Sequence, residues 1–264
     1  MKRRMVTLLT DFGTKDPYVA SMKGVILGIN SGCTLIDISH EVSPQDIREG
    51  ALILANAYSY FPKGTIHLAV VDPGVGSARK AILLVTKDYF FVGPDNGLLS
   101  LAAEKDKVKK AIVLSNRSFF RPSVSTTFHG RDVFAPIAGH LSTGVQPELL
   151  GRRVRSWVEL DLEEPRRVKA DLIGEISCMD AFGNLVTNIS QKDLNRFAEK
   201  REIVISIAQR EIRGLKKSYG EAKKGDLLAL IGSGDFLDIS IREGNAKKAL
   251  KSRQGDKVRI RLQT

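Results

Sequence analysis

The chain has 264 residues, of which 42% are hydrophobic and 27% are charged, and its formal net charge is +11. This composition is typical of a soluble globular protein and excludes a disordered, fibrous or low-complexity chain. The length is more than one hydrophobic core of ordinary size needs, so we expect two domains.

The first 145 residues alternate between strand-like and helix-like stretches. Apolar runs predict three strands, at residues 6–10, 34–38 and 65–71. The third run is nearly continuous in apolar residues, as expected of a strand buried on both faces. Apolar residues at helical spacing predict a helix over residues 43–60, which Ser43 can cap and in which Pro44 takes a favourable first position.

The alternation continues through the first half of the chain. Residues 81–85 and 89–92 predict a β-hairpin, and residues 111–114 predict a further strand. An apolar stripe predicts a helix over residues 132–143, with the acidic Asp132 at its start. This order of elements favours an α/β domain with a mostly parallel central sheet.

The pattern changes after a charged segment that contains Pro165, which we interpret as a linker over residues 151–169. Six short β-rich runs follow, at residues 172–177, 185–189, 203–207, 227–231, 237–241 and 258–262. Closely spaced short strands predict a small barrel or sandwich. The expected organisation is therefore an α/β domain over residues 1–150 and a smaller all-β domain over residues 170–264.

Neither a signal peptide nor a membrane span is expected near the start of the chain. The apolar run at residues 5–9 is interrupted by Thr10 and Asp11, which makes it too short for either. Cys33 and Cys178 lie far apart, without partners at metal-ligand spacing, which agrees with a reducing compartment. We therefore expect a cytoplasmic protein.

The positive charge lies mainly in the C-terminal part. From Arg166 onward, 21 Lys and Arg stand against 13 Asp and Glu, which accounts for +8 of the total +11. These residues come as scattered pairs without interleaved aromatic residues, which indicates a solvated surface rather than an RNA-binding face. We do not expect nucleic acid as a partner.

Three carboxylates, Asp11, Asp37 and Asp72, fall at the ends of predicted strands. The carboxyl ends of strands are where α/β sheets bind ligands, so a polar site is expected there. The glycines at residues 74 and 76 do not form a dinucleotide-binding loop, because the third glycine is missing, and no phosphate-binding loop occurs elsewhere.

Each candidate residue also has a structural interpretation. Asp72 and Arg79 can form a salt bridge that holds a loop, and His129 can pack locally before a helix. Asp11 can cap a turn, and Asn184 can be an ordinary turn residue. The histidines show no spacing typical of a zinc site, so no metal is expected.

Several motifs resemble one enzyme family, the S-adenosylmethionine (SAM) hydroxide adenosyltransferases, which are relatives of the fluorinases and chlorinases. The similar segments are residues 10–13 (TDFG) with Asp16 and residues 22–24 (MKG), residues 72–76 (DPGVG) with Arg79, residues 93–97 (GPDNG), residues 128–132 (FHGRD), and residues 180–184 (DAFGN) with residues 187–188 (TN). The resemblance extends over nearly the whole chain, and the combination of motifs is specific.

The resemblance implies an N-terminal α/β domain, a C-terminal β-barrel and a homotrimer. The ligand would lie between the N-terminal domain of one subunit and the C-terminal domain of its neighbour. The implied reaction is attack of water or hydroxide on C5′ of SAM, which releases adenosine and L-methionine. SAM is then the substrate, and no cofactor is expected.

The family's site residues correspond to specific positions of this chain. His129 and Asp72 would take or relay the proton, while Arg79 would stabilise the developing hydroxide. The implied binding residues are Asp11 for the ribose hydroxyls, Asp16 and Asp180 for the methionine amine, Asn184 with the backbone at Asn245 and Ala246 for adenine, and Ser233 for the methionine carboxylate. Halogenases follow this serine with arginine, whereas this chain has Gly234.

Two other functions remain as alternatives. A SAM-dependent halogenase shares most motifs, but those relatives lack the combination of Asp72, Arg79 and His129, which favours hydroxide over halide. The second alternative is a module that binds adenosyl ligands or RNA without catalysis, for which the basic C-terminal half is the supporting feature.

Overall fold

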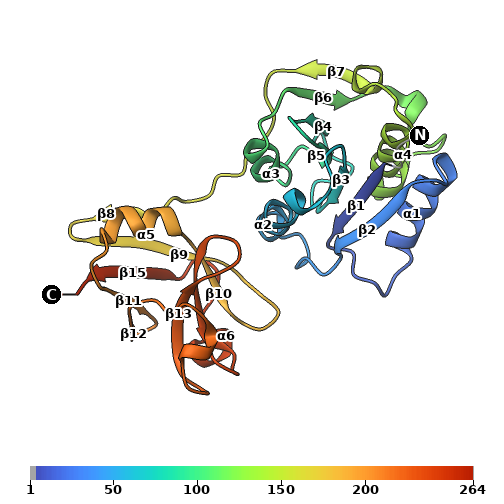
Figure 1. The fold of residues 1–264 in the computed structure, drawn as a ribbon. Coiled ribbons are helices and arrows are strands. Elements are labelled where there is room, and N and C mark those ends of the chain that lie inside the picture. The colour runs from blue at the N-terminus through green and yellow to red at the C-terminus, as the bar shows by residue number, and fades with distance from the viewer. Residues whose placement is uncertain (1–3, 264) are drawn as a thin grey trace. The chain divides into compact units, whose positions relative to one another are not determined.

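The structure is a computed structural model that describes residues 4–263, and the chain divides after Asp161 into two compact units (Figure 1). The N-terminal unit contains a seven-stranded sheet. Its strands, in spatial order, are β2 (Thr34–Ser39), β1 (Met5–Thr10), β3 (Ile66–Val70), β5 (Phe90–Pro94), β4 (Ala81–Val85), β6 (Lys110–Leu114) and β7 (Gly151–Val154).

The N-terminal sheet is mixed. The pairs β2–β1, β1–β3 and β3–β5 are parallel, and the pairs β5–β4, β4–β6 and β6–β7 are antiparallel. The prediction of a mostly parallel sheet therefore describes one half only. The other half turns antiparallel because the short connection between β4 and β5, predicted as a hairpin, can join only antiparallel neighbours.

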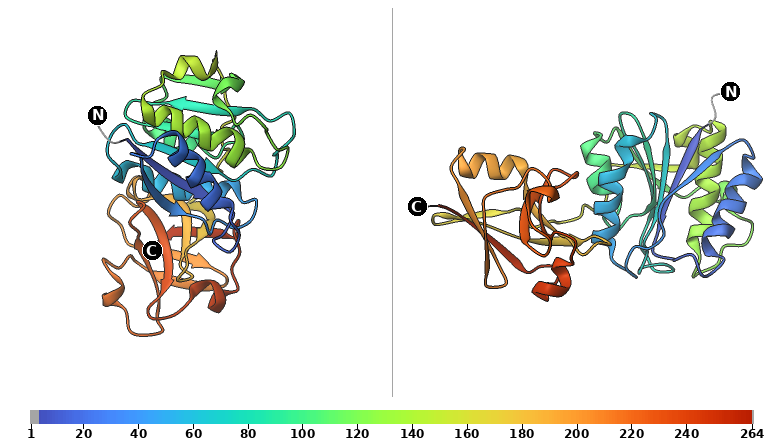
Figure 2. Two further views of the ribbon diagram at one scale, coloured as in Figure 1. Left: turned by 90° about the vertical axis from the view of Figure 1, so that its right-hand side faces the viewer. Right: turned by 60° about the horizontal axis from the view of Figure 1, so that its bottom comes forward.

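Helices cover both faces of this sheet (Figure 2). On one face, α1 (Tyr18–Ile29) and α4 (Ala135–Thr143) pack on apolar side chains of β1 and β3. On the other face lie α2 (Ile47–Ala57) and α3 (Ser100–Lys105). All five residues of β3 are buried, as its continuous apolar run predicted.

The predicted helix over residues 43–60 starts later than expected. Asp46, not Ser43, caps α2, because its side chain accepts the N–H of Glu49 at 2.9 Å. Gln45 has a φ of +66°, a backbone conformation that no α-helix contains. Short 3₁₀ turns complete this unit, at Tyr58–Tyr60, Arg117–Phe119 and Pro147–Leu150.

The segment interpreted as a linker contains two strands. Its first residues form β7 at the edge of the N-terminal sheet, and Arg166–Val168 forms β8, which pairs with β9. Both strands are rich in arginine and largely exposed, so they lack the apolar alternation that identifies a buried strand.

The C-terminal unit is an antiparallel sheet of eight strands. Along its main path the order is β12 (Arg210–Arg213), β11 (Ile203–Ile207), β15 (Lys257–Leu262), β9 (Asp171–Met179), β10 (Leu185–Ser190), β14 (Phe236–Ile241) and β13 (Leu227–Ile231). The sheet curves into a nearly closed barrel, in which the N–H of Lys216, just after β12, donates to the carbonyl of Ala229 in β13 at 2.8 Å.

Three short helical segments accompany the barrel, at α5 (Gln191–Ala198), Tyr219–Glu221 and α6 (Ala246–Leu250). The sequence analysis did not predict α5, which begins with a capping box between Ser190 and Asp193. No helix in the described part of the chain is long and apolar enough to cross a membrane.

Candidate active site

Asp11 and Asp72 lie at the same edge of the N-terminal sheet. Asp11 directly follows β1, and Asp72 comes two residues after β3. Because β1 and β3 are parallel neighbours, their carboxyl ends meet at an edge where α/β proteins bind ligands. Asp37, expected at the same edge, lies inside β2, where its carboxylate contacts Lys23 and His40.

The Arg79 guanidinium joins two other predicted site residues. Its Nε lies 2.8 Å from Oδ1 and 2.9 Å from Oδ2 of Asp72, and its Nη2 also donates to Oδ2. The same Nη2 lies 2.9 Å from Nδ1 of His129. The side chains of Arg79 and Asp72 are only 10% and 5% exposed. The structure therefore brings the three residues into contact, as the Asp72–Arg79–His129 cluster.

The loop of residues 72–79 folds back on itself and so returns Arg79 to the start of the loop. Ser77 Oγ donates to the carbonyl of Gly74 at 2.7 Å and accepts the N–H of Arg79 at 3.2 Å. These local bonds fix the conformation of the loop without help from a helix or strand.

Gly76 connects this loop to the segment that carries His129. Its φ is +78°, and a Cβ at this position would lie 2.6 Å from the carbonyl oxygen of Thr126. Only glycine satisfies both the backbone conformation and the close approach. The two segments of the cluster thus pack backbone against backbone.

The protonation of His129 follows from its contact with Arg79. A guanidinium has donors only, so Nδ1 of His129 accepts, and the neutral ring carries its proton on Nε2. Burial lowers the pKa of His129 and the charge of Arg79 lowers it further, against opposing effects of Asp72 and Asp132. His129 is therefore neutral at pH 7, and its Nε2–H is a hydrogen-bond donor.

His129 stands directly before an irregular helix. Gly130–Phe134 forms a π-helix that continues into α4, and π-turns are frequent at functional sites. Asp132 in this turn is fully buried, binds Arg131 through both oxygens and accepts the N–H of Ser125 at 2.8 Å. It thereby fastens the preceding loop to the helix that follows His129.

An aromatic cluster adjoins the predicted residues in the chain, and the sequence analysis did not single it out. Phe12 lies 5.9 Å from both Tyr18 and Phe128, and Tyr18 lies 5.1 Å from Phe128, all edge to face. Phe12 follows Asp11, and Phe128 precedes His129. Because Phe12 and Phe128 lie inside two of the motifs, the sequence could have indicated that these rings adjoin the site.

Asp11 and Asp16 have different surroundings. Asp11 Oδ2 accepts the N–H of Gln45 at 2.8 Å, in the loop before α2. Asp16 is exposed just before α1, and within residues 4–263 it makes no hydrogen bond or ion pair. Its carboxylate is therefore available to a ligand.

In the C-terminal unit, Asp180 and Asn184 form the two ends of a tight turn. Asp180 Oδ1 accepts the N–H groups of Phe182 and Asn184, each at 2.9 Å, and Oδ2 accepts Asn184 Nδ2 at 2.7 Å. Gly183 in this turn has a φ of +83°, and a Cβ there would lie 2.2 Å from Nδ2 of Asn245. The turn therefore packs directly on the start of α6.

Asn245 is the N-cap of α6, where its side chain accepts the N–H of Lys248 at 2.8 Å, and Ala246 is fully buried. The N–H of Lys247 donates to the carbonyl of Gly183 at 2.9 Å, which ties the helix to the turn. Ser233 is exposed between β13 and β14, and no hydrogen bond joins it to the other predicted residues in the part of the chain described.

Asp238 in β14 is an unusual residue that the sequence analysis missed. Burial raises the pKa of its carboxyl to about 7, and the negative charge of Asp180 contributes. A Cβ on Gly232 would lie 2.0 Å from Asp238 Oδ2, so the carboxyl packs on a glycine. The signal in the sequence was an acid within an otherwise largely apolar run.

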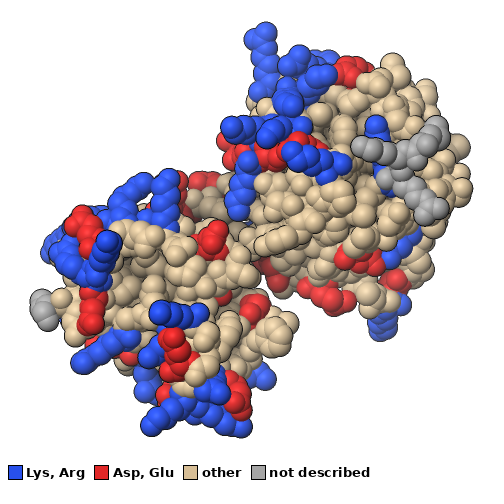
Figure 3. Space-filling view, in the orientation of Figure 1, with Lys and Arg blue, Asp and Glu red and all other residues tan. Residues whose placement is uncertain are grey.

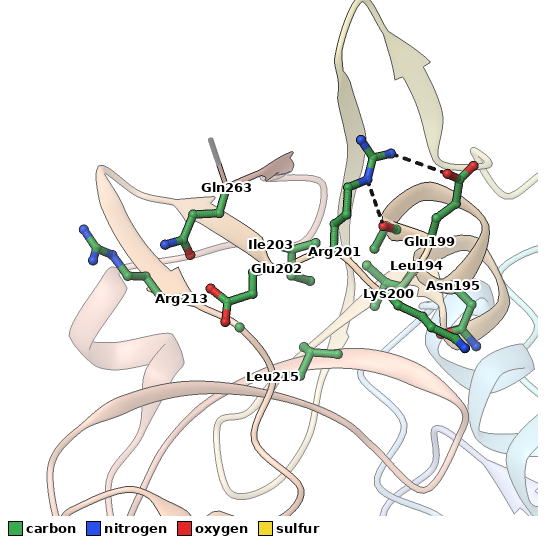
Figure 4. Close-up of a pocket in the computed structure, with 12 residues that line it drawn as sticks. Leu194, Asn195, Glu199, Lys200, Arg201, Glu202, Ile203, Arg213, Leu215 and Gln263 are labelled. Atoms are coloured by element: carbon green, nitrogen blue, oxygen red, sulfur yellow. Dashed lines mark hydrogen bonds and ion pairs between the residues drawn. The ribbon is translucent and has the colours of Figure 1, made fainter.

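A cavity of about 1040 Å³ in the C-terminal unit contains none of the predicted site residues (Figure 4). It lies beyond the end of α5 and beside β11 and β12, with Arg201 3.7 Å from Glu199 in an ion pair.

On the face drawn in Figure 3, Lys and Arg of this unit are interspersed with Asp and Glu. On that face, the positive charges do not form one continuous basic patch of the kind that binds nucleic acid.

Two domain families match the chain. Residues 6–151 match the SAM hydroxide adenosyltransferase N-terminal domain, and residues 174–259 match the corresponding C-terminal domain. The chain is 37% identical, over 97% of its length and 99% of the relative's, to an (R)-S-adenosyl-L-methionine hydrolase of Thermus thermophilus. It is 39% identical to the hydrolase of the same name from Methanocaldococcus jannaschii, over 97% of this chain and 95% of that one.

A crystal structure of an uncharacterized conserved protein from Thermotoga maritima has a similar fold. Its TM-score is 0.91 at 38% identity, covering 97% of this chain and 100% of that one. A protein of Actinoplanes named fluorinase is more distant, at 28% identity over 73% of this chain and 74% of its own length.

Proposed function

Since this chain belongs to the SAM hydroxide adenosyltransferase family, we propose that it hydrolyses SAM to adenosine and L-methionine. The Asp72–Arg79–His129 cluster is the observation that carries the reaction type, because it offers a carboxylate, a guanidinium and a neutral imidazole around one point. The names of the relatives identify (R)-SAM as the epimer to test first.

The chemistry of the substrate limits what the enzyme must supply. Methionine leaves a sulfonium as a neutral thioether, so no acid is needed for the leaving group and no cofactor is needed for the reaction. The protein must hold a water molecule in line behind C5′ and accept its proton as the C–O bond forms. Positioning alone can supply about 7–11 kcal/mol of the barrier in well-oriented cases.

The cluster divides these tasks among its members. His129 Nδ1 is engaged by Arg79, so the ring presents its Nε2–H and orients the water by donating to it. Arg79 stabilises the negative charge that develops on the oxygen. Asp72, whose carboxylate already accepts from Arg79, takes the proton as hydroxide character develops.

The binding roles are assigned to the remaining predicted residues. Asp11 binds the ribose hydroxyls, Asp16 and Asp180 face the methionine amine, and Ser233 faces the carboxylate. Asn184 and the backbone at Asn245 and Ala246 bind adenine. From membership of the family, we propose a homotrimer in which neighbouring subunits complete each site. A cytoplasmic location remains a prediction.

Product analysis tests the proposal. Purified protein with SAM is expected to release adenosine and methionine in equal amounts, with no change when excess chloride is added. His129→Ala removes the donor that orients the attacking water and is expected to lose about 10²–10³-fold in rate. Unchanged SAM would contradict hydrolysis and favour a binding module, whereas 5′-chloro-5′-deoxyadenosine would identify a halogenase.

His129→Gln separates the two possible roles of the imidazole. The amide of glutamine can place an N–H near the position of Nε2 but cannot accept a proton at neutral pH. If His129 only donates, this variant retains more activity than His129→Ala. Equal activities of the two variants would contradict the donor assignment.

A further inference from the structure

The buried residue His40 holds the turn that carries Asp11 at two points. Its side chain is almost fully buried, and Nδ1 lies 2.8 Å from Oγ1 of Thr10. The same hydroxyl accepts the N–H of Phe12 at 3.2 Å. The carbonyl of His40 accepts the N–H of Gly13 at 2.8 Å. The residues on both sides of Asp11 are therefore fixed by one histidine.

The other side of the ring faces a carboxylate. His40 Nε2 lies 3.0 Å from Oδ1 of Asp37, although the N–H does not point along a hydrogen bond, so the contact is electrostatic. Asp37 Oδ2 also accepts Lys23 Nζ at 2.6 Å. Burial acts to raise the pKa of Asp37, but its contacts with Lys23 and His40 outweigh burial and lower it.

These contacts give the network one consistent direction. A negative Asp37 favours the proton of His40 on Nε2, so Nδ1 is left to accept. Thr10 then donates its hydroxyl hydrogen to Nδ1 and keeps its oxygen for the N–H of Phe12. Both contacts of the Thr10 hydroxyl are thereby assigned, which restricts this hydroxyl to one orientation.

Asp11 itself is held less tightly than its neighbours. Its Oδ2 accepts the N–H of Gln45, whereas within the described residues no hydrogen bond reaches Oδ1. The backbone of residues 10–13 therefore decides where the free oxygen points. This backbone is held from below by His40.

We propose that His40 is a positioning residue that aims the Asp11 carboxylate at the ribose hydroxyls of the adenosyl group. The assignment rests on the proposed function, in which Asp11 is the ribose acceptor. His40 touches no substrate atom, so its effect is on recognition of the ribose and not on the chemical step.

The test is a cycle of equilibrium binding with adenosine, 2′-deoxyadenosine and 3′-deoxyadenosine as the probes. A hydrogen bond to a charged group contributes about a ten- to hundredfold change in affinity. Wild-type protein is expected to prefer adenosine over at least one deoxy analogue by roughly this factor. In His40→Asn, the preference is expected to shrink to about threefold or less, while kcat for SAM changes little and KM rises.

His67, in β3, supplies a matched control. It is also a buried histidine whose Nδ1 lies 2.8 Å from a threonine hydroxyl, that of Thr7, but it lies among aromatic side chains away from the turn. His67→Asn is expected to keep the full preference for adenosine over the deoxy analogues, which we call the hydroxyl preference. Thr10→Val serves as a second variant if His40→Asn does not fold. It removes the threonine hydroxyl through which His40 holds the turn, and it preserves the shape of the side chain.

The outcomes separate this proposal from the proposed function. An unchanged hydroxyl preference in His40→Asn or Thr10→Val, or its equal loss in His67→Asn, would overturn the positioning role. Wild-type protein that binds adenosine without any hydroxyl preference would overturn it as well, whatever the reaction. Failure of wild-type protein to hydrolyse SAM, with the binding cycle as expected, would overturn only the proposed function.

Discussion

His67 makes the N-terminal unit sensitive to acid. The imidazole is completely buried in β3 among Tyr58, Tyr89 and Phe91, and no partner reaches its Nε2 in the described structure. Burial lowers the pKa of His67 from 6.5 to about 3. The folded state therefore keeps the ring neutral under conditions in which the unfolded chain binds a proton.

The sign and size of the effect follow from this difference. Between pH 6.5 and about 3 the unfolded state binds more protons, so the free energy of unfolding falls as the pH falls. Below about pH 3 both states bind the proton, and the loss of stability stays at its full size. Each pH unit is worth about 1.4 kcal/mol. At pH 4.5, His67 alone is therefore expected to lower the free energy of unfolding by roughly 3 kcal/mol relative to pH 7.5.

Urea unfolding at a series of pH values measures this loss. Trp157 is the single tryptophan of the chain and packs on the core of the N-terminal unit, so its fluorescence reports on that unit. His67→Asn is less stable at pH 7.5 because it leaves a cavity, but it lacks the titrating ring. Its stability is expected to fall less steeply from pH 7 to 5. Parallel slopes for wild type and variant would refute the reasoning.

Three further predictions concern the site and its supports. Gly76→Ala is expected to lower kcat by at least about tenfold, because a Cβ would strike the carbonyl of Thr126; Gly64→Ala, at φ +87° in open space, is the control and should keep the activity. Asp238→Asn is expected to stabilise the C-terminal unit by up to about 4 kcal/mol at pH 8 but little at pH 4, because burial raises the pKa of Asp238 to about 7 in the folded state; urea unfolding followed by circular dichroism at the two pH values checks this. Asp132→Asn should weaken the attachment of the loop before the π-helix, because it weakens the hydrogen bond from the N–H of Ser125. The expected result is faster proteolysis between residues 121 and 127, and protection equal to that of the wild type would contradict this role of Asp132.

The fold was predictable where a local sequence pattern alone determines the secondary structure. The buried strand β3 and the β4–β5 hairpin followed from apolar runs and a tight connection. The edge strand β7 was interpreted as part of the linker, because its arginines are exposed and because its partner strand β6 is distant in the sequence. Helix α1 was also missed, since it contains Gly24 and Gly28, which disfavour a helix, and no side-chain cap marks its start.

The contact among three of the predicted site residues could be expected from the sequence, but the way they bond could not. The motifs indicated that Asp72, Arg79 and His129 belong to one site. The nitrogen of the imidazole that contacts the guanidinium could not be predicted, because it depends on how two loops pack. The pKa of Asp238 could not be predicted either, because the burial of its carboxyl and its distance from Asp180 depend on the tertiary structure.

The most direct test of the account is hydrolysis of SAM in water enriched in ¹⁸O, with both products examined by mass spectrometry. Attack of water on C5′ predicts that the label enters the 5′-hydroxyl of adenosine and that methionine stays unlabelled. Adenosine without the label, or a labelled amino-acid product, would contradict attack at C5′ and with it the assigned reaction.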